Sequence, residues 1–339
     1  MLKTRYAEDE RFHGTKSVLT VHNAIFKGIF SYSQLEIIPE LHLSGMEFLQ
    51  YGDGWVSTLR AGIAFADKIN AVSPNYAAEL VTPLGSHGLV DDFVHRAKDL
   101  HGIVNGCDYS EWNPSHDEYL PEHYNDDLES MLAGKLASKT ALQKELGLPE
   151  REVPMIGMVC RLTHQKGFHY ILPILDKFLK NDVQVVIIGT GEPQIASHLN
   201  DLAEEFSEKL AFVEAYSNRF AHLVEAGSDF FLMPSEFEAC GLNQIYSMAY
   251  GTLPIVRKVG GLKDTVIDFD DDPNNATGFG FVEPCHDALL IVLQRALLFY
   301  LQHPEQMHEM QLRSMRKDFS WTESAKEYVK MYDLALETN

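Results

Sequence analysis

Short, mostly apolar runs alternate with helix-length segments in the second half of the chain. The runs cover residues 155–160, 183–188, 230–233 and 253–256, and a polar or glycine-containing turn follows each of them. Short apolar runs bounded by turn signals are typical of strands buried in a parallel sheet. The pattern therefore predicts a doubly wound α/β unit over about residues 153–319.

The first half shows a weaker version of the same alternation. Strand-like runs at 18–22, 68–72 and 102–104 are separated by helical segments at 55–66 and 76–80. This order predicts one further parallel sheet. Three longer helices are also expected, one of them stopped by Gly147, and they cover residues 128–146, 289–301 and 322–336.

Composition limits the classes of partner. The chain has 339 residues, 45% of them apolar and 23% charged, which is an ordinary make-up for two globular domains. A formal net charge of −21 disfavours nucleic acid, because basic side chains must neutralise the phosphates. No apolar segment reaches the length of a signal peptide or membrane span, so no membrane partner is expected.

The cysteines indicate a compartment and argue against one kind of site. Cys107, Cys160, Cys240 and Cys285 are scattered along the chain without paired spacing. This pattern indicates neither a zinc site nor a disulfide scaffold. We therefore expect no metal and a reducing cytoplasmic location.

The segment from residue 232 to 262 carries the densest candidate chemistry. Glu238 follows the strand at 230–233, Gly241 allows a turn into a helix at 242–250, and Gly260 and Gly261 open a second turn. An acid at the carboxyl edge of a parallel sheet, beside a helix start that offers unpaired N–H groups, suggests a site for a phosphorylated sugar. The alternative is that the glycines are ordinary helix ends and that Glu238 caps the next helix.

Two neighbouring strands bring further groups to the same edge. Arg161 and Lys166 follow the strand at 155–160, and both can reach one diphosphate. Gly189 and Thr190 follow the strand at 183–188, in a tight turn that lets the backbone approach a ligand. Together with Glu238, these residues predict a nucleotide-sugar site.

These strings also carry a family resemblance. In the second half they are RLTHQKG at 161–167, IIGTGEP at 187–193, LMPSEFEACGLNQIYSMAYGTLPIVRKVGGLKDTV at 232–266 and TGFGF at 277–281. The first half contributes LTVHNAIFKGIF at 19–30, GMEFLQYG at 45–52, LRAGIAFADKINAVSPNYAAEL at 59–80 and GIVNGCDYSEWNP at 102–114. In this order the chain resembles bacterial glycogen synthases and plant starch synthases over nearly its whole length.

The resemblance implies a fold, a reaction and a domain division. The fold would be two Rossmann-like domains (the GT-B architecture), and the reaction would be retaining transfer of glucose from ADP-glucose to the non-reducing end of an α-1,4-glucan. No cofactor is implied beyond the donor substrate ADP-glucose. The expected domains are a partial amino-terminal domain with linker at 1–149, a nucleotide-sugar-binding domain at 150–320, and a terminal helix at 321–339 that packs back on the first.

Roles for individual residues also come from the resemblance. Arg161 and Lys166 match positions that neutralise the leaving ADP, Glu238 matches the acid that meets the glucosyl ring, and His22 matches a histidine that faces the donor sugar. Tyr216 matches the aromatic residue that stacks on the nucleobase, and Tyr246 stands where related transferases carry a second acid. The remaining residues expected to line the donor site are Gly189, Thr190, Cys240, Gly241, Leu242, Asn243, Gly260 and Gly261.

The chain departs from the family pattern in several places. Ala215, Ala239, Asn243 and Arg60 replace residues common among relatives, and no Lys-x-Gly-Gly-Leu loop precedes His22. We therefore expect the first domain to lack its amino-terminal part and the 339 residues alone to show no glucan elongation. Two alternatives stay open: an inactive remnant that binds nucleotide or glucan, and a UDP-glucose-dependent glucosyltransferase.

Overall fold

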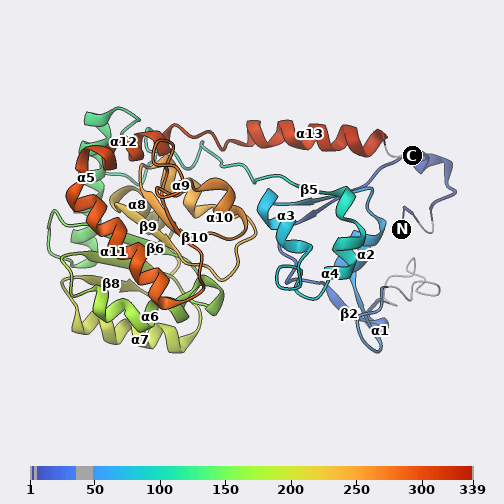
Figure 1. Cartoon of the computed structure of the whole chain (residues 1–339), viewed down its shortest axis with the longest axis horizontal. Coiled ribbons are helices and arrows are strands. Elements are labelled where there is room, and N and C mark those ends of the chain that lie inside the picture. Colours follow the sequence, from blue (N-terminus) through green and yellow to red (C-terminus); the bar gives the residue numbers. More distant parts are fainter. Residues whose placement is uncertain (1, 4–5, 36–48, 338–339) are drawn as a thin grey trace. The chain divides into compact units, whose positions relative to one another are not determined.

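The computed structural model describes residues 2–3, 6–35 and 49–337, and the chain divides into two compact units (Figure 1). The first unit comprises Met1–Asn105 with Ser324–Asn339, and the second comprises Gly106–Glu323. Part of the motif at residues 45–52 lies outside the described residues. The two units are described separately below.

The first unit contains a three-stranded parallel sheet in the order β1-β4-β5. The expected strands at 18–22 and 68–72 are confirmed as β1 (Val18–Val21) and β4 (Lys68–Ala71). The third strand comes earlier than expected, as β5 (Leu100–Gly102). Asp99 accepts hydrogen bonds from Lys68 and Arg96, and this contact brings Leu100 beside Ile69 at the start of the pairing.

The segment expected to be one helix at 55–66 is divided in two. Its first residues form β3 (Trp55–Ser57), which pairs antiparallel with β2 (Ile29–Ser31). The Ser57 side chain accepts a hydrogen bond from the Arg60 N–H, so it caps the helix that begins at Thr58. The helices of this unit are α1 (Tyr32–Leu35), α2 (Thr58–Phe65), α3 (Pro74–Leu80), α4 (Val90–His95), two 3-10 turns (Glu10–Phe12, Ala97–Asp99), and α13 (Trp321–Glu337) from Ser324 onward.

The second unit contains a six-stranded sheet in the order β11-β10-β9-β6-β7-β8, and all its neighbouring strands are parallel. The chain builds β6, β7 and β8 outward in one direction and β9, β10 and β11 in the other, so the order reverses between β6 and β9. In open α/β sheets, ligands bind outside the carboxyl ends of the strands at such a reversal. The strands are β6 (Met155–Val159), β7 (Gln184–Ile188), β8 (Leu210–Val213), β9 (Phe230–Met233), β10 (Leu253–Arg257) and β11 (Phe279–Phe281).

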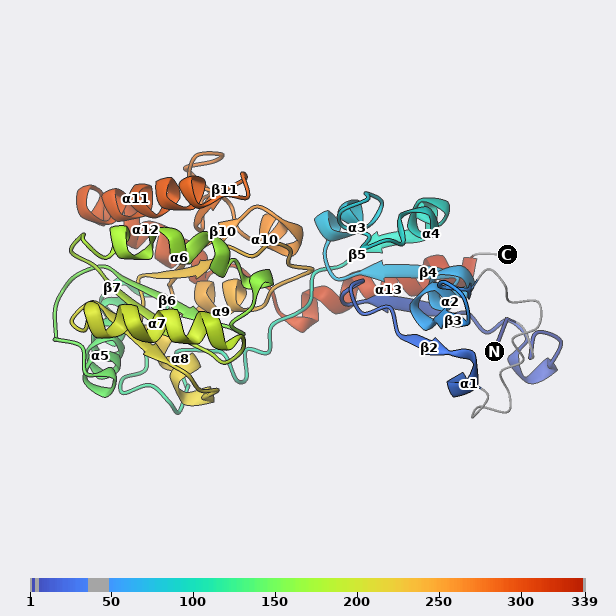
Figure 2. The same ribbon diagram turned by 90° about the horizontal axis from the view of Figure 1, so that it is seen from below.

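Helices cover both faces of this sheet (Figure 1, Figure 2). Alternate strand residues point to opposite faces. Ile156 and Val185 belong to a buried cluster with α6 and α11, whereas Met155 and Val186 belong to one with α5 and α8. The helices are α5 (Leu128–Leu146), α6 (Phe168–Phe178), α7 (Pro193–Glu205), α8 (Asn218–Gly227), α9 (Asn243–Ala249), α10 (Gly260–Thr265), α11 (His286–Gln302), α12 (Pro304–Met315) and a 3-10 turn (His164–Lys166).

The expected helix at 128–146 is confirmed residue for residue as α5, but α5 belongs to the second unit. Lys135 on α5 is buried and donates hydrogen bonds to the carbonyls of Ala226, Ser228 and Tyr250 and to the Thr252 hydroxyl. Burial lowers the pKa of Lys135 to about 7. These contacts tie α5 to the second sheet, so the units divide at Asn105 rather than at residue 149.

Candidate active site

Two adjoining cavities lie at the carboxyl ends of the central strands of the second unit. The smaller, of about 170 Å³, lies between β6 and β9, and the larger, of about 390 Å³, extends from there to the loop after β7 and the start of α8. They share the lining residues Val159, Cys160, Leu242 and Asn243. The order of the strands therefore brings together the loops that the sequence predicted to form the site.

Most of the expected donor-site residues line these cavities. Lys166, Glu238 and Gly241 line the smaller one. The larger one is lined by Arg161, Gly189, Thr190 and Tyr216. Leu242 and Asn243 border both, and the Asn243 amide donates a hydrogen bond of 2.8 Å to the Val159 carbonyl.

An ion pair crosses the smaller cavity from one central strand to the other. The Lys166 ammonium, from the loop after β6, lies 2.5 Å from Oε2 of Glu238, from the loop after β9. The Ser235 hydroxyl donates a second hydrogen bond of 3.1 Å to the same oxygen. A charge-assisted contact of this length, largely shielded from water, holds both side chains in place. The cation and the acid that the sequence marked separately thus neutralise each other in this structure.

The loop that carries Glu238 is shaped by a close approach of Gly261. The Gly261 N–H donates a hydrogen bond of 3.1 Å to the Glu238 carbonyl. A β-carbon on Gly261 would lie 2.1 Å from the Cys240 carbonyl oxygen, so only glycine fits without a shift of the backbone. Gly260 and Gly261 line neither cavity. The contact of Gly261 here is therefore with the acidic loop itself.

The far end of the larger cavity reaches the exposed side chain of Tyr216. The Tyr216 side chain is 87% exposed there, at the rim. The loop after β7 is fastened to the loop after β6, because the Leu162 N–H donates a hydrogen bond of 2.9 Å to the Thr190 carbonyl. The Arg161 guanidinium donates to the Gln165 side chain at 3.2 Å and is exposed to solvent. A flat, uncovered aromatic ring at the mouth of a cavity can stack on a nucleobase.

An aromatic column that the sequence reasoning missed forms one wall of the larger cavity. The Trp112 ring stacks on Tyr246 at 3.9 Å and 1°, and its other face stacks on His222 at 3.9 Å and 11°. Nδ1 of His222 lies 2.7 Å from Asp117, which also accepts a hydrogen bond from the Tyr250 hydroxyl. Burial would raise the pKa of Asp117, but these hydrogen bonds outweigh it and lower that pKa. Trp112 lies in the motif at 102–114, and this motif was the sequence feature that could have pointed to a role for Trp112 in the site.

A buried acid, also missed from the sequence, contributes to the floor of the larger cavity. Glu225 on α8 is 1% exposed and accepts a hydrogen bond of 2.5 Å from the Ser247 hydroxyl. Burial raises the pKa of Glu225 well above its ordinary range, so burial favours the protonated form of this carboxyl. The cavity therefore has a buried carboxyl group on α8, whereas the side chain at position 246 on α9 is a tyrosine.

The remaining candidates are placed as follows. His22 follows β1 in the first unit and is exposed, and its role at the donor sugar stays a prediction. Cys240 is buried beside Glu238. Among the described residues, no group of three or more His, Cys, Asp or Glu side chains could hold a metal ion, and no helix is long and apolar enough to cross a membrane.

Comparison with known proteins identifies related sequences and folds. Residues 1–95 match the family described as the starch synthase catalytic domain, and residues 138–311 match glycosyl transferases group 1. A glycogen synthase of Vibrio cholerae serotype O1 is 73% identical over 335 residues, which are 99% of this chain and 69% of that protein. A glycogen synthase of Photobacterium profundum is 58% identical, over 98% of this chain and 65% of that protein.

Solved structures give the same result at the level of the fold. The catalytic domain of starch synthase IV from Arabidopsis thaliana, bound to ADP and acarbose, matches with a TM-score of 0.90 at 31% identity, over 99% of this chain and 70% of that one. A sucrose-phosphate synthase from Thermosynechococcus elongatus matches with a TM-score of 0.58 at 18% identity, over 95% of this chain and 68% of that one, which supports the fold alone.

The two parallel sheets, the cavity at the strand reversal and these matches define a glycosyltransferase of the GT-B architecture with Rossmann-like units. This confirms the fold class expected from the sequence. The chain belongs to the glycogen synthase family. It is accordingly a hexosyltransferase by family.

We expect Gly261→Ala to destabilise the second unit. The new methyl group would collide with the Cys240 carbonyl, and a backbone atom cannot move aside as a flexible side chain can. The free energy of unfolding should fall by about 1–3 kcal/mol. Urea unfolding measures it, with Lys263→Ala, an exposed position on the same helix, as the control. Equal stability of Gly261→Ala and wild type would contradict the close approach.

We expect Glu225→Gln to change how stability depends on pH. The pKa of Glu225 is higher in the folded than in the unfolded protein. Its contribution to stability is therefore complete at pH values below the unfolded-state pKa, and it is lost as the pH rises toward the folded-state pKa. Glutamine keeps the acceptor for Ser247 but does not titrate. Above about pH 5 the free energy of unfolding of the variant should rise relative to that of wild type, by at most about 1.4 kcal/mol per pH unit.

Thermal unfolding of both proteins across this pH range measures the difference. Glu283→Gln, at an exposed position, is the matched control, and its stability should depend on pH in the same way as that of wild type. If the stability of Glu225→Gln also depends on pH in the same way as that of wild type, Glu225 is ionised in the folded protein.

Proposed function

We propose that this chain carries the donor site for transfer of glucose from ADP-glucose to the non-reducing end of an α-1,4-glucan, with retention, as in glycogen synthesis. The observation that carries the proposal is the pair of Lys166 and Glu238, 2.5 Å apart in the small cavity and next to a larger cavity that reaches Tyr216. Membership of the glycogen synthase family supports the same reaction.

The sizes of the two cavities suggest how a donor is divided between them. The larger one, of about 390 Å³, suits a nucleoside, and the smaller one, of about 170 Å³, suits a single sugar ring. The diphosphate would then lie where the cavities meet, beside the shared residues Leu242 and Asn243. The Arabidopsis starch synthase that this chain resembles was solved with ADP and acarbose, which supports a nucleotide of this kind and a glucan-like ligand.

The charges in the site favour departure of a diphosphate. Arg161 lines the larger cavity and Lys166 the smaller, so a cation lies on each side of the junction. Negative charge develops on the leaving diphosphate as the glycosidic bond breaks, and fixed cations stabilise that charge most in the transition state. Lys166 would then be shared between Glu238 and the distal phosphate.

Glu238 is proposed to act on the sugar rather than on the phosphates. Its carboxylate can accept hydrogen bonds from hydroxyl groups of the glucosyl ring, which carries partial positive charge in an oxocarbenium-like transition state. The neighbouring thiol of Cys160 offers no nucleophile, because burial raises its pKa to about 12. His22, in the first unit, is proposed to face the donor sugar, on the resemblance alone.

We expect Lys166→Ala to weaken binding of ADP more than binding of AMP. A charge-assisted contact to the distal phosphate contributes about 1.5–3 kcal/mol, and AMP lacks that phosphate. Calorimetry with ADP, AMP and UDP measures the affinities, with Lys263→Ala as the control, and tighter binding of UDP than of ADP would favour the UDP-glucose alternative. Equal losses for ADP and AMP would remove Lys166 from the distal phosphate.

We expect Glu238→Gln to reduce turnover by at least about 100-fold while the ADP affinity stays within about twofold, since its contacts are made in the transition state. Transfer of radiolabelled glucose from ADP-glucose to glycogen is assayed in a fusion of this chain with the part of the Vibrio cholerae relative that it does not match. Glu283→Gln is the matched control.

The 339-residue chain is measured alongside the fusion, and the sequence predicts no transfer by it. Unchanged turnover of the Glu238→Gln fusion would make Glu238 a structural helix cap. Absence of transfer by the wild-type fusion would contradict the proposed reaction.

A further inference from the structure

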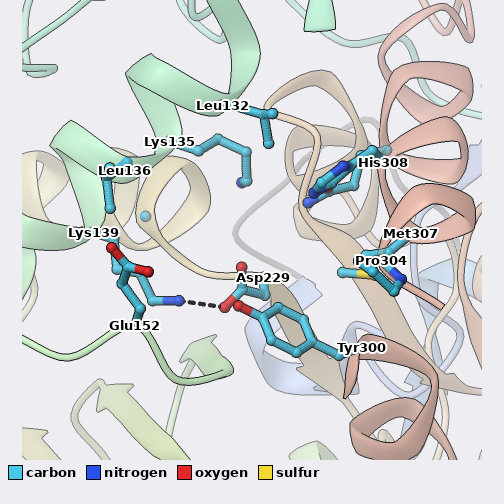
Figure 3. Close-up of a pocket in the computed structure, with 12 residues that line it drawn as sticks. Leu132, Lys135, Leu136, Lys139, Glu152, Asp229, Tyr300, Pro304, Met307 and His308 are labelled. Atoms are coloured by element: carbon cyan, nitrogen blue, oxygen red, sulfur yellow. Dashed lines mark hydrogen bonds and ion pairs between the residues drawn. The ribbon is translucent and has the colours of Figure 1, made fainter. Parts of the chain in front are cut away.

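A third cavity of the second unit lies at the opposite edge of the six-stranded sheet. It has a volume of about 320 Å³ and is bordered by α5, α11 and α12 (Figure 3). Asp229, which immediately precedes β9, lines it and accepts a hydrogen bond of 2.8 Å from the N–H of Met155, the first residue of β6. The cavity shares no lining residue with the two cavities of the candidate active site.

Two lysines of α5 reach the floor of this cavity, and protein groups already bind both. The Lys139 ammonium lies 2.6 Å from Oδ2 of Asp229, as the dashed line in Figure 3 shows. The Lys135 ammonium has four acceptors within hydrogen-bond distance. Neither cation is therefore available as an unsatisfied anion receptor.

Other polar groups on the cavity wall have no partner among the described residues. The Gln311 side chain on α12 is only 3% exposed, yet its amide makes no hydrogen bond in the described part of the chain. Oδ1 of Asp229 and the carboxylate of Glu152 likewise make none there. The amide atoms of Gln311 are not fully enclosed, so water or a ligand in the cavity can reach them. These groups together offer two carboxylate acceptors and one amide that can donate and accept.

The rest of the wall is apolar. The Tyr300 ring, Pro304 and Met307 form one side, and the half-exposed Leu132 and Leu136 of α5 form the other (Figure 3). Lys139 neutralises Asp229, whereas Glu152 adds a carboxylate that makes no ion pair among the described residues. An anion such as a phosphate would meet both carboxylates, so a neutral ligand is favoured. A ligand with hydroxyl groups and apolar C–H faces matches both kinds of wall.

We propose that this cavity binds a neutral carbohydrate, namely one or two units of an α-glucan chain. Hydroxyl groups would donate to Asp229 and Glu152 and exchange hydrogen bonds with Gln311, and a sugar ring would pack against Tyr300. The volume is at the lower end of the range for ligand pockets, which suits so small a segment. The choice of glucan rests on the proposed function. The site would hold the polymer on the second unit, away from the reacting cavities.

Methyl NMR on the full chain, labelled with ¹³C-methyl methionine, tests the proposal. Met307 lines this cavity and Met233 lines the smaller active-site cavity, so each methyl group reports on one site. Titration with maltotriose in the presence of saturating ADP should shift the Met307 signal to a plateau. ADP alone should shift Met233 and leave Met307 in place, which tests the nucleotide site independently.

Variants identify the groups that bind the sugar. Gln311→Leu should weaken the Met307 response about tenfold, which is the effect of losing one buried hydrogen-bond partner of about 1.4 kcal/mol. Gln306→Leu, an exposed position on the same helix, should leave it unchanged. Tyr300→Phe keeps the ring and should retain binding within about threefold, so it serves if Gln311→Leu does not fold.

Three results would overturn the proposal. They are a maltotriose shift at Met233 alone, a Met307 shift caused by inorganic phosphate but not by maltotriose, and an identical response of Gln311→Leu and wild type. The first would mean that glucan binds only at the active site. A failure of ADP to shift Met233 would instead count against the proposed function and leave the sugar cavity standing.

Discussion

The second unit depends on one backbone contact, the parallel pairing of β6 with β9, in which Ile156 lies opposite Phe230. The chain leaves β6 in one direction and reaches β9 only after building β7 and β8, so no helix fills the space between the two strand ends. At the carboxyl edge this leaves the cavity in which Lys166 and Glu238 meet. At the amino edge the same pairing is closed by Asp229, which binds the first N–H of β6.

The titratable groups buried around this sheet are stabilised in three different ways. Lys166 and Glu238 neutralise each other across the cavity. Burial instead raises the pKa of Glu225 and so favours its protonated form, although the hydrogen bond from Ser247 acts in the opposite direction. Lys135 donates hydrogen bonds to carbonyl oxygens, but burial still lowers its pKa to about 7. Each arrangement limits the cost of burying an ionisable group.

The candidate site combines fixed and exposed parts. Gly261 and the Glu238 carbonyl hold the acidic loop, and the stack of Trp112 on Tyr246 supports one wall. Tyr216 and Arg161, in contrast, lie at the open rim. A well-supported floor with an exposed edge suits a ligand whose charged part must be placed accurately and whose base stacks at the rim.

The sequence by itself determined the elements whose pattern is local. Apolar runs gave the strand Phe230–Met233, and Gly147 marked the end of α5, since strand burial and helix termination depend on neighbouring residues. It also placed Arg161, Lys166 and Glu238 after parallel strands. Because the carboxyl ends of parallel strands share one edge, that was enough to predict a common site.

Only the tertiary structure decided which distant groups touch. The assignment of α5 to the second unit follows from Lys135 meeting carbonyls far away in sequence. The stacking of Trp112 on Tyr246, and the raised pKa of Glu225, depend on packing that no spacing along the chain reveals. Sequence pattern fixes local geometry through backbone preference, whereas burial and pairing of side chains are set by which elements the fold brings together.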